Sequence, residues 1–292
     1  MSSSKLIIGG AQIGLNYGVS NTKGQLNTCE IESIVNIANS NDINFIDTAS
    51  AYGNSEKVIG KYLKSDWKII TKLSDILSKN NKDTIFNNTK NSFFSSLQKL
   101  HRKNIYGLLL HSTDELKGSG GHEIWSALLE LKNEGFVDKI GYSIYDPEEL
   151  DDLYMDYEAD IIQAPLSIFD QRLKDSGWLE RLNKNAVEIH IRSIFLQGLL
   201  LMKPEDRPKN FLKWGKIWKE WDNWLVKNKI TSIEACIYFA LSQKNVDKIV
   251  VGINSSNELQ EILNITARNK NKILFPQGCM DKNLINPINW EA

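Results

Sequence analysis

Short apolar runs alternate with longer amphipathic stretches along the chain. Each short run is rich in isoleucine, leucine and valine, as strands buried on both faces of a parallel sheet are. These runs predict strands at 6–8, 44–47, 68–71, 105–110, 139–143, 161–163, 187–191 and 248–251. The stretches between them repeat apolar residues at helical spacing, which predicts helices near 28–41, 54–64, 83–102, 121–135, 146–155, 174–185, 231–243 and 255–267.

Two of these helices have recognisable starts. Thr28 precedes Glu30 and an apolar stripe that begins at Ile31, as an N-cap residue does. Pro147 directly follows Asp146 and suits the first position of a helix.

The alternation of strands and helices implies a parallel sheet with right-handed crossovers. Eight such units in 292 residues favour a closed (β/α)8 TIM barrel over an open, doubly wound sheet. The open nucleotide-binding sheet also needs GxGxxG after its first strand, whereas residues 9–14 read GGAQIG, which has the wrong spacing. We therefore expect a single barrel domain over residues 1–292.

Residues 203–229 interrupt the rhythm after the seventh strand. A start that contains two prolines leads into a helix-like stretch with tryptophans at helical spacing: Trp214, Trp218, Trp221 and Trp224. We expect an inserted helix that packs this aromatic stripe on the barrel, because such a stripe is more often core than a ligand site. A helix at this point of the fold could also form part of an active-site wall.

Composition argues against several classes of function. The formal net charge of −1 and the lack of a long basic run argue against a nucleic-acid partner. Cys29, Cys236 and Cys279 are scattered, which indicates reduced thiols and neither a disulfide framework nor a metal site. The apolar runs are too short to span a membrane, and the N-terminus does not resemble a signal peptide. We expect a cytoplasmic protein that acts on a small molecule, and the oligomeric state stays open.

Four polar residues fall at the ends of neighbouring predicted strands, where the βα loops of a TIM barrel converge. Asp47 ends the second strand and Tyr52 lies in its loop, while Lys72 and His111 end the third and fourth. Taken singly, each has an ordinary explanation, as a helix cap, a turn, a solvated strand end or a core histidine. Together they favour an active site, because such groups are costly to bury unless they pair.

The chemistry of these residues is coherent. A tyrosine with a pKa of about 10 is a weak acid at neutral pH, and a nearby ammonium such as that of Lys72 lowers the pKa. Asp47 can hold Lys72 as its ion-pair partner, and a neutral His111 can orient a substrate carbonyl by donating a hydrogen bond. The set lacks a hydride source, so a cofactor must supply hydride.

With these residues the sequence resembles the aldo-keto reductase family. The matching stretches run from about residue 6 to 267 in the family's order: 45–53 (FIDTASAYG), 55–60 (SEKVIG), 69–72 (IITK), 108–111 (LLLH), 140–143 (IGYS), Gln163, 197–200 (QGLL) and 249–256 (IVVGINSS). The DTA-x-x-YG block is the most specific of them. The resemblance implies that Asp47, Tyr52, Lys72 and His111 form a catalytic tetrad in which Tyr52 is the general acid of carbonyl reduction.

The resemblance also implies how a nicotinamide cofactor is bound. Ser143 and Gln163 would hold the carboxamide, and the loop at Leu196, Gln197 and Gly198 would hold the pyrophosphate.

Two positions at the nicotinamide depart from the family pattern. Ile144 follows Ser143 where the family often has Asn, so one carboxamide contact is expected to be absent. Arg192 stands where the family often has an aromatic residue that stacks on the nicotinamide. A guanidinium could stack on the ring in its place, reach an anionic group of the substrate, or form an ordinary salt bridge.

The resemblance also implies that the adenosine end of the cofactor binds to the segment that contains Gly252, Ser255, Ser256 and Glu258. The free N–H groups and dipole of a helix start suit an anionic group there. Members that prefer NADPH usually place Lys or Arg beside the ribose phosphate, but residues 250–262 contain neither. The resemblance implies NADPH, while Glu258 leaves NADH open, since a carboxylate suits ribose hydroxyl groups.

The expected substrate is an aldehyde or ketone, with a sugar-type carbonyl as one candidate. Ile13, Tyr17 and the C-terminal tail are expected to line the pocket, and Arg172 offers a second arginine for an anionic or sugar group. Two alternatives stay open: a cofactor-binding sensor or regulatory subunit with little turnover, and a lyase or isomerase that uses the cofactor only transiently.

Overall fold

Eight parallel strands close into a barrel in the computed structural model, which describes residues 3–77, 84–268 and 273–290. Neighbouring strands in the chain are neighbours in the barrel, and Leu6 of the first strand lies opposite Ile249 of the last. The strands are β1 (Leu6–Gly9), β2 (Phe45–Asp47), β3 (Lys68–Leu73), β4 (Ile105–Leu110), β5 (Val137–Ser143), β6 (Ile161–Pro165), β7 (Glu188–Arg192) and β8 (Lys248–Gly252). The predicted (β/α)8 TIM barrel is confirmed, and every predicted strand overlaps an observed one.

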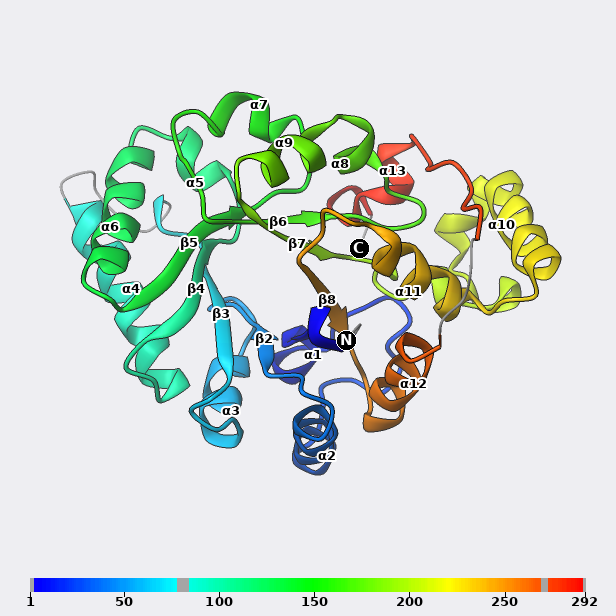
Figure 1. The fold of residues 1–292 in the computed structure, drawn as a ribbon, viewed down its shortest axis with the longest axis horizontal. Coiled ribbons are helices and arrows are strands. Elements are labelled where there is room, and N and C mark those ends of the chain that lie inside the picture. The colour runs from blue at the N-terminus through cyan, green and yellow to red at the C-terminus, as the bar shows by residue number, and fades with distance from the viewer. Residues whose placement is uncertain (1–2, 78–83, 269–272, 291–292) are drawn as a thin grey trace.

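Helices connect the strands and surround the barrel (Figure 1). The longer ones are α2 (Thr28–Asn39), α3 (Ser55–Tyr62), α4 (Ile85–Leu100), α6 (Gly121–Asn133), α10 (Gly215–Asn228), α11 (Ser232–Ser242) and α12 (Ser256–Thr266). The shorter ones are α1 (Ala11–Gly14), α5 (Asp114–Lys117), α7 (Glu149–Leu153), α8 (Arg172–Asp175), α9 (Trp178–Lys184) and α13 (Lys282–Ile285). Side chains cap several starts, as in the capping box that Thr231 and Glu234 form at α11.

Local chemistry moves some helix starts from their predicted places. The N-cap of α2 is Asn27 and not Thr28, because the Asn27 side chain accepts the N–H of Glu30. Pro147 lies in a turn, and α7 begins only at Glu149. The predicted helix over 146–155 is therefore shorter than expected.

The predicted helix at 174–185 is two helices, α8 and α9. Gly177 separates them with a left-handed φ of 82°, which glycine adopts at little cost. The helix predicted near 83–102 corresponds to α4, which begins at Ile85. Residue 83 itself lies outside the described residues.

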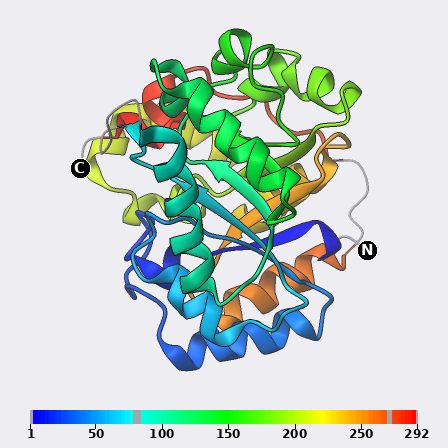
Figure 2. The same cartoon turned by 90° about the vertical axis from the view of Figure 1, so that its left-hand side faces the viewer.

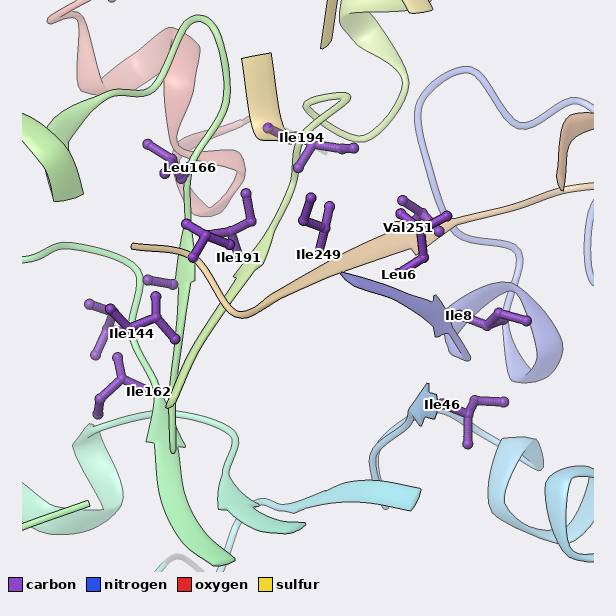
Figure 3. Packing of buried hydrophobic residues seen from close by; sticks show 14 of the residues in the cluster. Leu6, Ile8, Ile46, Ile144, Ile162, Leu166, Ile191, Ile194, Ile249 and Val251 are labelled. Atoms are coloured by element: carbon purple, nitrogen blue, oxygen red, sulfur yellow. The ribbon is translucent and has the colours of Figure 1, made fainter. Parts of the chain in front are cut away.

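Alternate residues of each strand point to opposite sides of the barrel wall. Inside the barrel, the packed apolar residues are Ile7, Phe45, Ile70, Leu109, Ile161 and Val250. On the other side of the wall, residues such as Leu6, Ile8, Ile249 and Val251 belong to a larger apolar core shared with the surrounding elements (Figure 3). Full burial of one such side chain stabilises the fold by roughly 1.5–3 kcal/mol. Burial on both faces explains why the strands read as continuous apolar runs.

A polar cluster fills the end of the barrel at which the strands begin. Glu188, at the start of β7, accepts hydrogen bonds from Lys139, from Tyr106 Oη at 2.5 Å and, across 2.6 Å, from the Nε2 of buried His190. Burial would raise the pKa of Glu188, but the contacts with His190, Lys139 and Tyr106 outweigh it and lower the pKa to about 2. The carboxylate therefore stays ionised and holds this end of the barrel together.

The insertion after β7 passes through 3-10 turns at Leu199–Leu201, Pro204–Asp206 and Lys209–Trp214 before it enters α10. Trp218 stacks on Phe169, in the loop after β6, with ring centroids 5.5 Å apart. Trp224 stacks on Trp221 at 5.7 Å. Figure 1 shows α10, in yellow, at the periphery of the molecule. The expected packing role of the tryptophan stripe is confirmed.

The C-terminal segment is tied down by polar contacts. Trp214 Nε1 donates to Asp281 at 2.7 Å, and Lys282 pairs with Asp146 at 2.7 Å. Figure 2 shows α13, in red, on the opposite side of the molecule from the start of β1. Within the described residues, no helix combines the length and the apolar character needed to cross a membrane.

Candidate active site

Two residues of the predicted tetrad, Asp47 and Lys72, meet near the ends of β2 and β3, beside Gln163 of β6. Lys72 Nζ lies 2.5 Å from Asp47 Oδ2 and donates a second hydrogen bond of 3.1 Å to the Thr48 carbonyl. The other Asp47 oxygen accepts a hydrogen bond of 2.7 Å from Gln163 Nε2. All three side chains are buried. The prediction that Asp47 holds Lys72 as its partner is confirmed.

Tyr52 lies over this ion pair. The Lys72 Nζ is 5.4 Å from the centroid of the Tyr52 ring. The His111 ring meets the Tyr52 ring edge to face, with centroids 5.4 Å apart and planes at 82°. The structure therefore brings the four predicted residues together, from β2, its loop, β3 and the residue after β4.

The pKa of Tyr52 differs from the sequence expectation. Burial, and then the negative charge of Asp47, raise it above its ordinary value, and Arg192 opposes them. The expected lowering by Lys72 is wrong for this structure, because burial and the charge of Asp47, the ion-pair partner of Lys72, raise the pKa. Tyr52 is therefore a phenol that keeps its proton throughout the neutral range.

His111 is neutral at physiological pH. Burial lowers its pKa to about 4, and the positive charges of Lys72 and Arg192 act in the same direction. Burial also lowers the pKa of Lys72, while Asp47 opposes that shift. A neutral imidazole can donate one N–H without competing for the proton of Tyr52.

The turn that carries Tyr52 is held by the neighbouring strands. The Ser50 N–H donates to the Lys72 carbonyl at 2.9 Å, and the Tyr52 N–H to the Ala49 carbonyl at 3.0 Å. Gly53 follows with a φ of 54°, and a Cβ there would lie 2.5 Å from the Gly14 carbonyl oxygen. Glycine is thus required after the tyrosine, which explains the Tyr-Gly pair.

A cavity of about 640 Å³ opens above the tetrad. The predicted site residues that line it are Asp47, Tyr52, His111, Ser143, Gln163, Arg192, Gln197, Gly198, Gly252 and Glu258. Lys72 lies beneath Tyr52, fully buried. Tyr17 and the tail residues Pro287 and Ile288 line the cavity as expected, whereas Ile13 and the insertion at 203–229 do not.

Arg192 is held by neutral groups. Its guanidinium donates to Ser143 Oγ at 3.3 Å and to the Ile144 carbonyl at 2.8 Å, and lies 4.4 Å from the centroid of the Tyr145 ring. No carboxylate of the described chain pairs with Arg192, so the salt-bridge interpretation is wrong. Ile144 itself is buried and does not line the cavity.

The loop after β7 has an unusual backbone. Leu196, Gln197 and Gly198 have φ values of 50°, 53° and 89°, a left-handed run that is strained at the first two positions. The N–H groups of Ile194, Phe195 and Gln197 donate to no described residue. Free N–H groups in such a loop suit an anion. Leu196 is buried and does not line the cavity, and its own N–H donates to the Ser193 carbonyl at 2.8 Å.

The start of α12 differs from the sequence expectation. Ser255 caps the helix by accepting the Glu258 N–H, and the Ser256 N–H donates to Glu30 of α2 at 2.6 Å. Neither serine lines the cavity. Of the N–H groups at this helix start, those of Ser256 and Glu258 are thus already occupied.

Arg172 does not serve as a second arginine of the pocket. It is buried and forms ion pairs with Asp146 at 2.7 Å and with Asp170 at 2.8 Å. Its role is to join the loops that follow β5 and β6, so the expectation of an anion or sugar contact there is wrong.

Sequence reasoning overlooked Gln12, Tyr145, Asn254 and Glu30. The first three follow the ends of β1, β5 and β8 and line the cavity. A search of the residues just after each predicted strand could therefore have found them. Glu30 of α2 does not line the cavity but contacts the start of α12 beside it, and no local signal in the sequence marks it.

Comparison with known proteins agrees with this geometry. The model of the aldo/keto reductase family matches residues 5–273. The NADH-specific methylglyoxal reductase of Escherichia coli (strain K12) is 26% identical over 263 residues, which cover 78% of this chain and 79% of that protein. The D-arabinose 1-dehydrogenase of Saccharomyces cerevisiae is 28% identical over 228 residues, with coverages of 70% and 65%. The solved aldo-keto reductase AKR11C1 from Bacillus halodurans (holo form) shares the fold, with a TM-score of 0.70, 20% identity and coverages of 92% and 88%.

Proposed function

This chain belongs to the aldo/keto reductase family of oxidoreductases, and on that premise we propose that it reduces an aldehyde or ketone to an alcohol with a nicotinamide cofactor. Tyr52 would give the proton. The observation that carries the proposal is the convergence of Tyr52, His111 and the buried Lys72–Asp47 pair at one end of the cavity. These groups can position and protonate a carbonyl oxygen, but none of them can deliver hydride.

The residues of the cavity fit a dinucleotide. The cavity volume of about 640 Å³ falls within the range of volumes of small-molecule and cofactor sites. The unpaired N–H groups of Ile194, Phe195 and Gln197 suit a pyrophosphate. Ser143 Oγ and the Gln163 side-chain oxygen would hold the carboxamide, while Gln163 Nε2 stays on Asp47. When bound, the cofactor supplies the hydride.

The protein's own part in the reaction is the proton. A Tyr52 phenol with a raised pKa stays protonated until a stronger base forms next to it, and a developing alkoxide is such a base. Neutral His111 donates a hydrogen bond to the carbonyl oxygen and orients it toward Tyr52.

The substrate is proposed only as a class. The names of the two relatives refer to methylglyoxal and D-arabinose, which supports a small or sugar-type carbonyl. The resemblance implied NADPH as the cofactor, whereas the name of one relative specifies NADH.

Titration with NADH and NADPH, followed by a panel of aldehydes, ketones and sugars, tests the proposal. We expect cofactor oxidation with part of the panel, and a loss of about 10²–10⁴-fold in kcat for Tyr52→Phe with nucleotide affinity retained. Tyr62→Phe, on α3 and outside the cavity, is the control and should keep full turnover.

Tight nucleotide binding with no turnover on any carbonyl would contradict the proposal. It would favour the sensor or regulatory subunit, an alternative to which the departures from the family pattern at Ile144 and Arg192 point. Product formation without net cofactor oxidation would favour a lyase or isomerase.

A further inference from the structure

The end of the cavity between β1, β8 and the start of α12 is lined by the acceptors of Gln12, Asn254 and Glu258. A second carboxylate, that of Glu30, lies outside the lining but contacts the first residue of α12. We infer, on the basis of the proposed nicotinamide-dependent activity, that this end takes an adenosine ribose with free hydroxyl groups. Glu30 and Glu258 would then make the enzyme select NADH over NADPH.

The tetrad decides which part of a dinucleotide lies here. The nicotinamide must meet Tyr52 and His111, and the N–H groups of the β7 loop suit the pyrophosphate. The adenosine therefore lies in the remaining part of the same cavity, beside Gly252, Asn254 and Glu258.

Glu30 occupies the place where helix α12 would otherwise receive a phosphate. Its Oε2 accepts a hydrogen bond of 2.6 Å from the N–H of Ser256, the first residue of α12. That hydrogen bond lowers the pKa of Glu30, so the carboxylate is ionised at neutral pH. The Glu258 N–H is likewise taken, by Ser255 Oγ at 3.3 Å. The first turn of α12 thus offers a phosphate fewer donors and meets it with negative charge.

Glu258 adds a second carboxylate, which lines the cavity directly. Its Oε2 accepts hydrogen bonds from the Asn254 N–H at 2.7 Å and from Asn254 Nδ2 at 3.2 Å. The other oxygen has no partner among the described residues. This arrangement holds a carboxylate in place with one oxygen available to a hydroxyl group.

Two more acceptors at this end lack donors. Gln12 is only 7% exposed and lines the cavity, and its Oε1 has no hydrogen-bond partner in the described chain. Gln12 packs against Gly252, where a Cβ would lie 2.7 Å from Gln12 Nε2. Asn254 Oδ1 is buried and unpaired in the same way. Buried acceptors are costly without donors. Ribose hydroxyl groups supply donors, whereas a phosphate dianion supplies none.

Among the described residues, no lysine or arginine lines this end of the cavity. Of the described residues that line the cavity, Arg192 is the single lysine or arginine, and it lies beside Tyr145 at the end of β7. Lys23, whose charge acts on Glu30, is exposed on the loop after β1. A carboxylate at the ribose is the arrangement that accepts a 2′-hydroxyl, while a 2′-phosphate needs a cation.

Equilibrium binding of NADH and NADPH to the full chain, followed by fluorescence, tests the inference. We expect NADH to bind about 10-fold more tightly, or better, since two carboxylates each oppose the phosphate through partly solvated contacts. Adenosine 5′-monophosphate should also displace bound NADH better than adenosine 2′,5′-bisphosphate does.

Glu30→Gln keeps an acceptor for the Ser256 N–H and removes the charge. It should raise the affinity for NADPH about 3- to 10-fold and change that for NADH less than about twofold. Glu258→Gln should shift the preference in the same direction. Glu32→Gln, an exposed position on the same helix α2, is the matched control and should leave the preference unchanged.

The outcomes separate this inference from the proposed function. Equal affinities, or tighter binding of NADPH, overturn the inference and leave the proposed function standing. An equal change in preference for Glu30→Gln and Glu32→Gln overturns the role of Glu30. If neither nucleotide binds, both proposals fall.

Discussion

Lys72→Met tests the ion pair beneath the tyrosine. The Lys72 and Asp47 side chains are only 1% and 5% exposed, and Nζ lies 2.5 Å from Oδ2. Methionine is close to lysine in length but carries no charge, so the substitution largely preserves the shape of the site. It leaves the Asp47 carboxylate with the Gln163 side chain as its remaining hydrogen-bond donor, at 2.7 Å.

Removal of one partner from a buried ion pair costs about 3–5 kcal/mol, because the other charge stays buried without a counter-ion. The loss in the free energy of unfolding should also depend on pH. A buried carboxylate without a cation favours its protonated form. In the unfolded chain an Asp, with a pKa of about 3.9, is ionised at neutral pH. Folding of the variant is therefore coupled to the uptake of a proton. The deficit relative to wild type should therefore shrink as the pH falls from about 8 to about 5.

Urea unfolding across that pH range measures the effect. The double variant Asp47→Asn/Lys72→Met should recover more than half of the loss, since neither charge remains. Lys117→Met, which removes an exposed partner of Asp114 at 3.3 Å, is the control and should cost less than about 0.5 kcal/mol. The reasoning is refuted if Lys72→Met matches wild type at neutral pH or loses further stability as the pH falls.

Three further predictions concern charge at the two ends of the barrel. The imidazole of His111, whose pKa burial lowers to about 4, should show no titration near pH 6 by NMR, and an apparent pKa there would contradict its neutral role. In Arg192→Met the same resonance should titrate at higher pH, because Arg192 is one cause of the lowering; an unchanged titration would show that the guanidinium does not act on the site. Glu188→Gln should cost about 2–4 kcal/mol in thermal or urea unfolding at neutral pH. That difference should fade from about pH 4.5 towards pH 2, where a carboxylate with a lowered pKa in the fold loses its contribution, and equal stabilities at neutral pH would contradict it.

The barrel was predictable because its strands are buried on both faces. Ile7 points into the barrel and its neighbours Leu6 and Ile8 into the outer core, so the run is apolar without interruption. Helix boundaries were less predictable, since single contacts decide them. The choice between Asn27 and Thr28 as the cap of α2 depends on which side chain reaches the Glu30 N–H.

The tetrad was predictable for a geometric reason. Parallel strands deliver the residues at their carboxyl ends to one rim, whatever the loops do, and Asp47, Lys72 and His111 are such residues. The pKa of Tyr52 was not predictable in the same way. The pKa is raised first by burial and then by the charge of Asp47, with Arg192 opposing both, and these are properties of the packed site.

The start of α12 shows that a matching sequence motif does not by itself establish an anion-binding site. Ser255 stands where the resemblance puts it, and it caps the helix as a serine at that position should. Its neighbour Ser256 nevertheless offers no free N–H, because Glu30, 226 positions away in the chain, accepts it. A strand end keeps its direction regardless of its neighbours, whereas a helix start is an anion site only while no acid of the protein reaches it first. The charge of a ligand at such a helix start must therefore be inferred from the packed contacts and not from the motif.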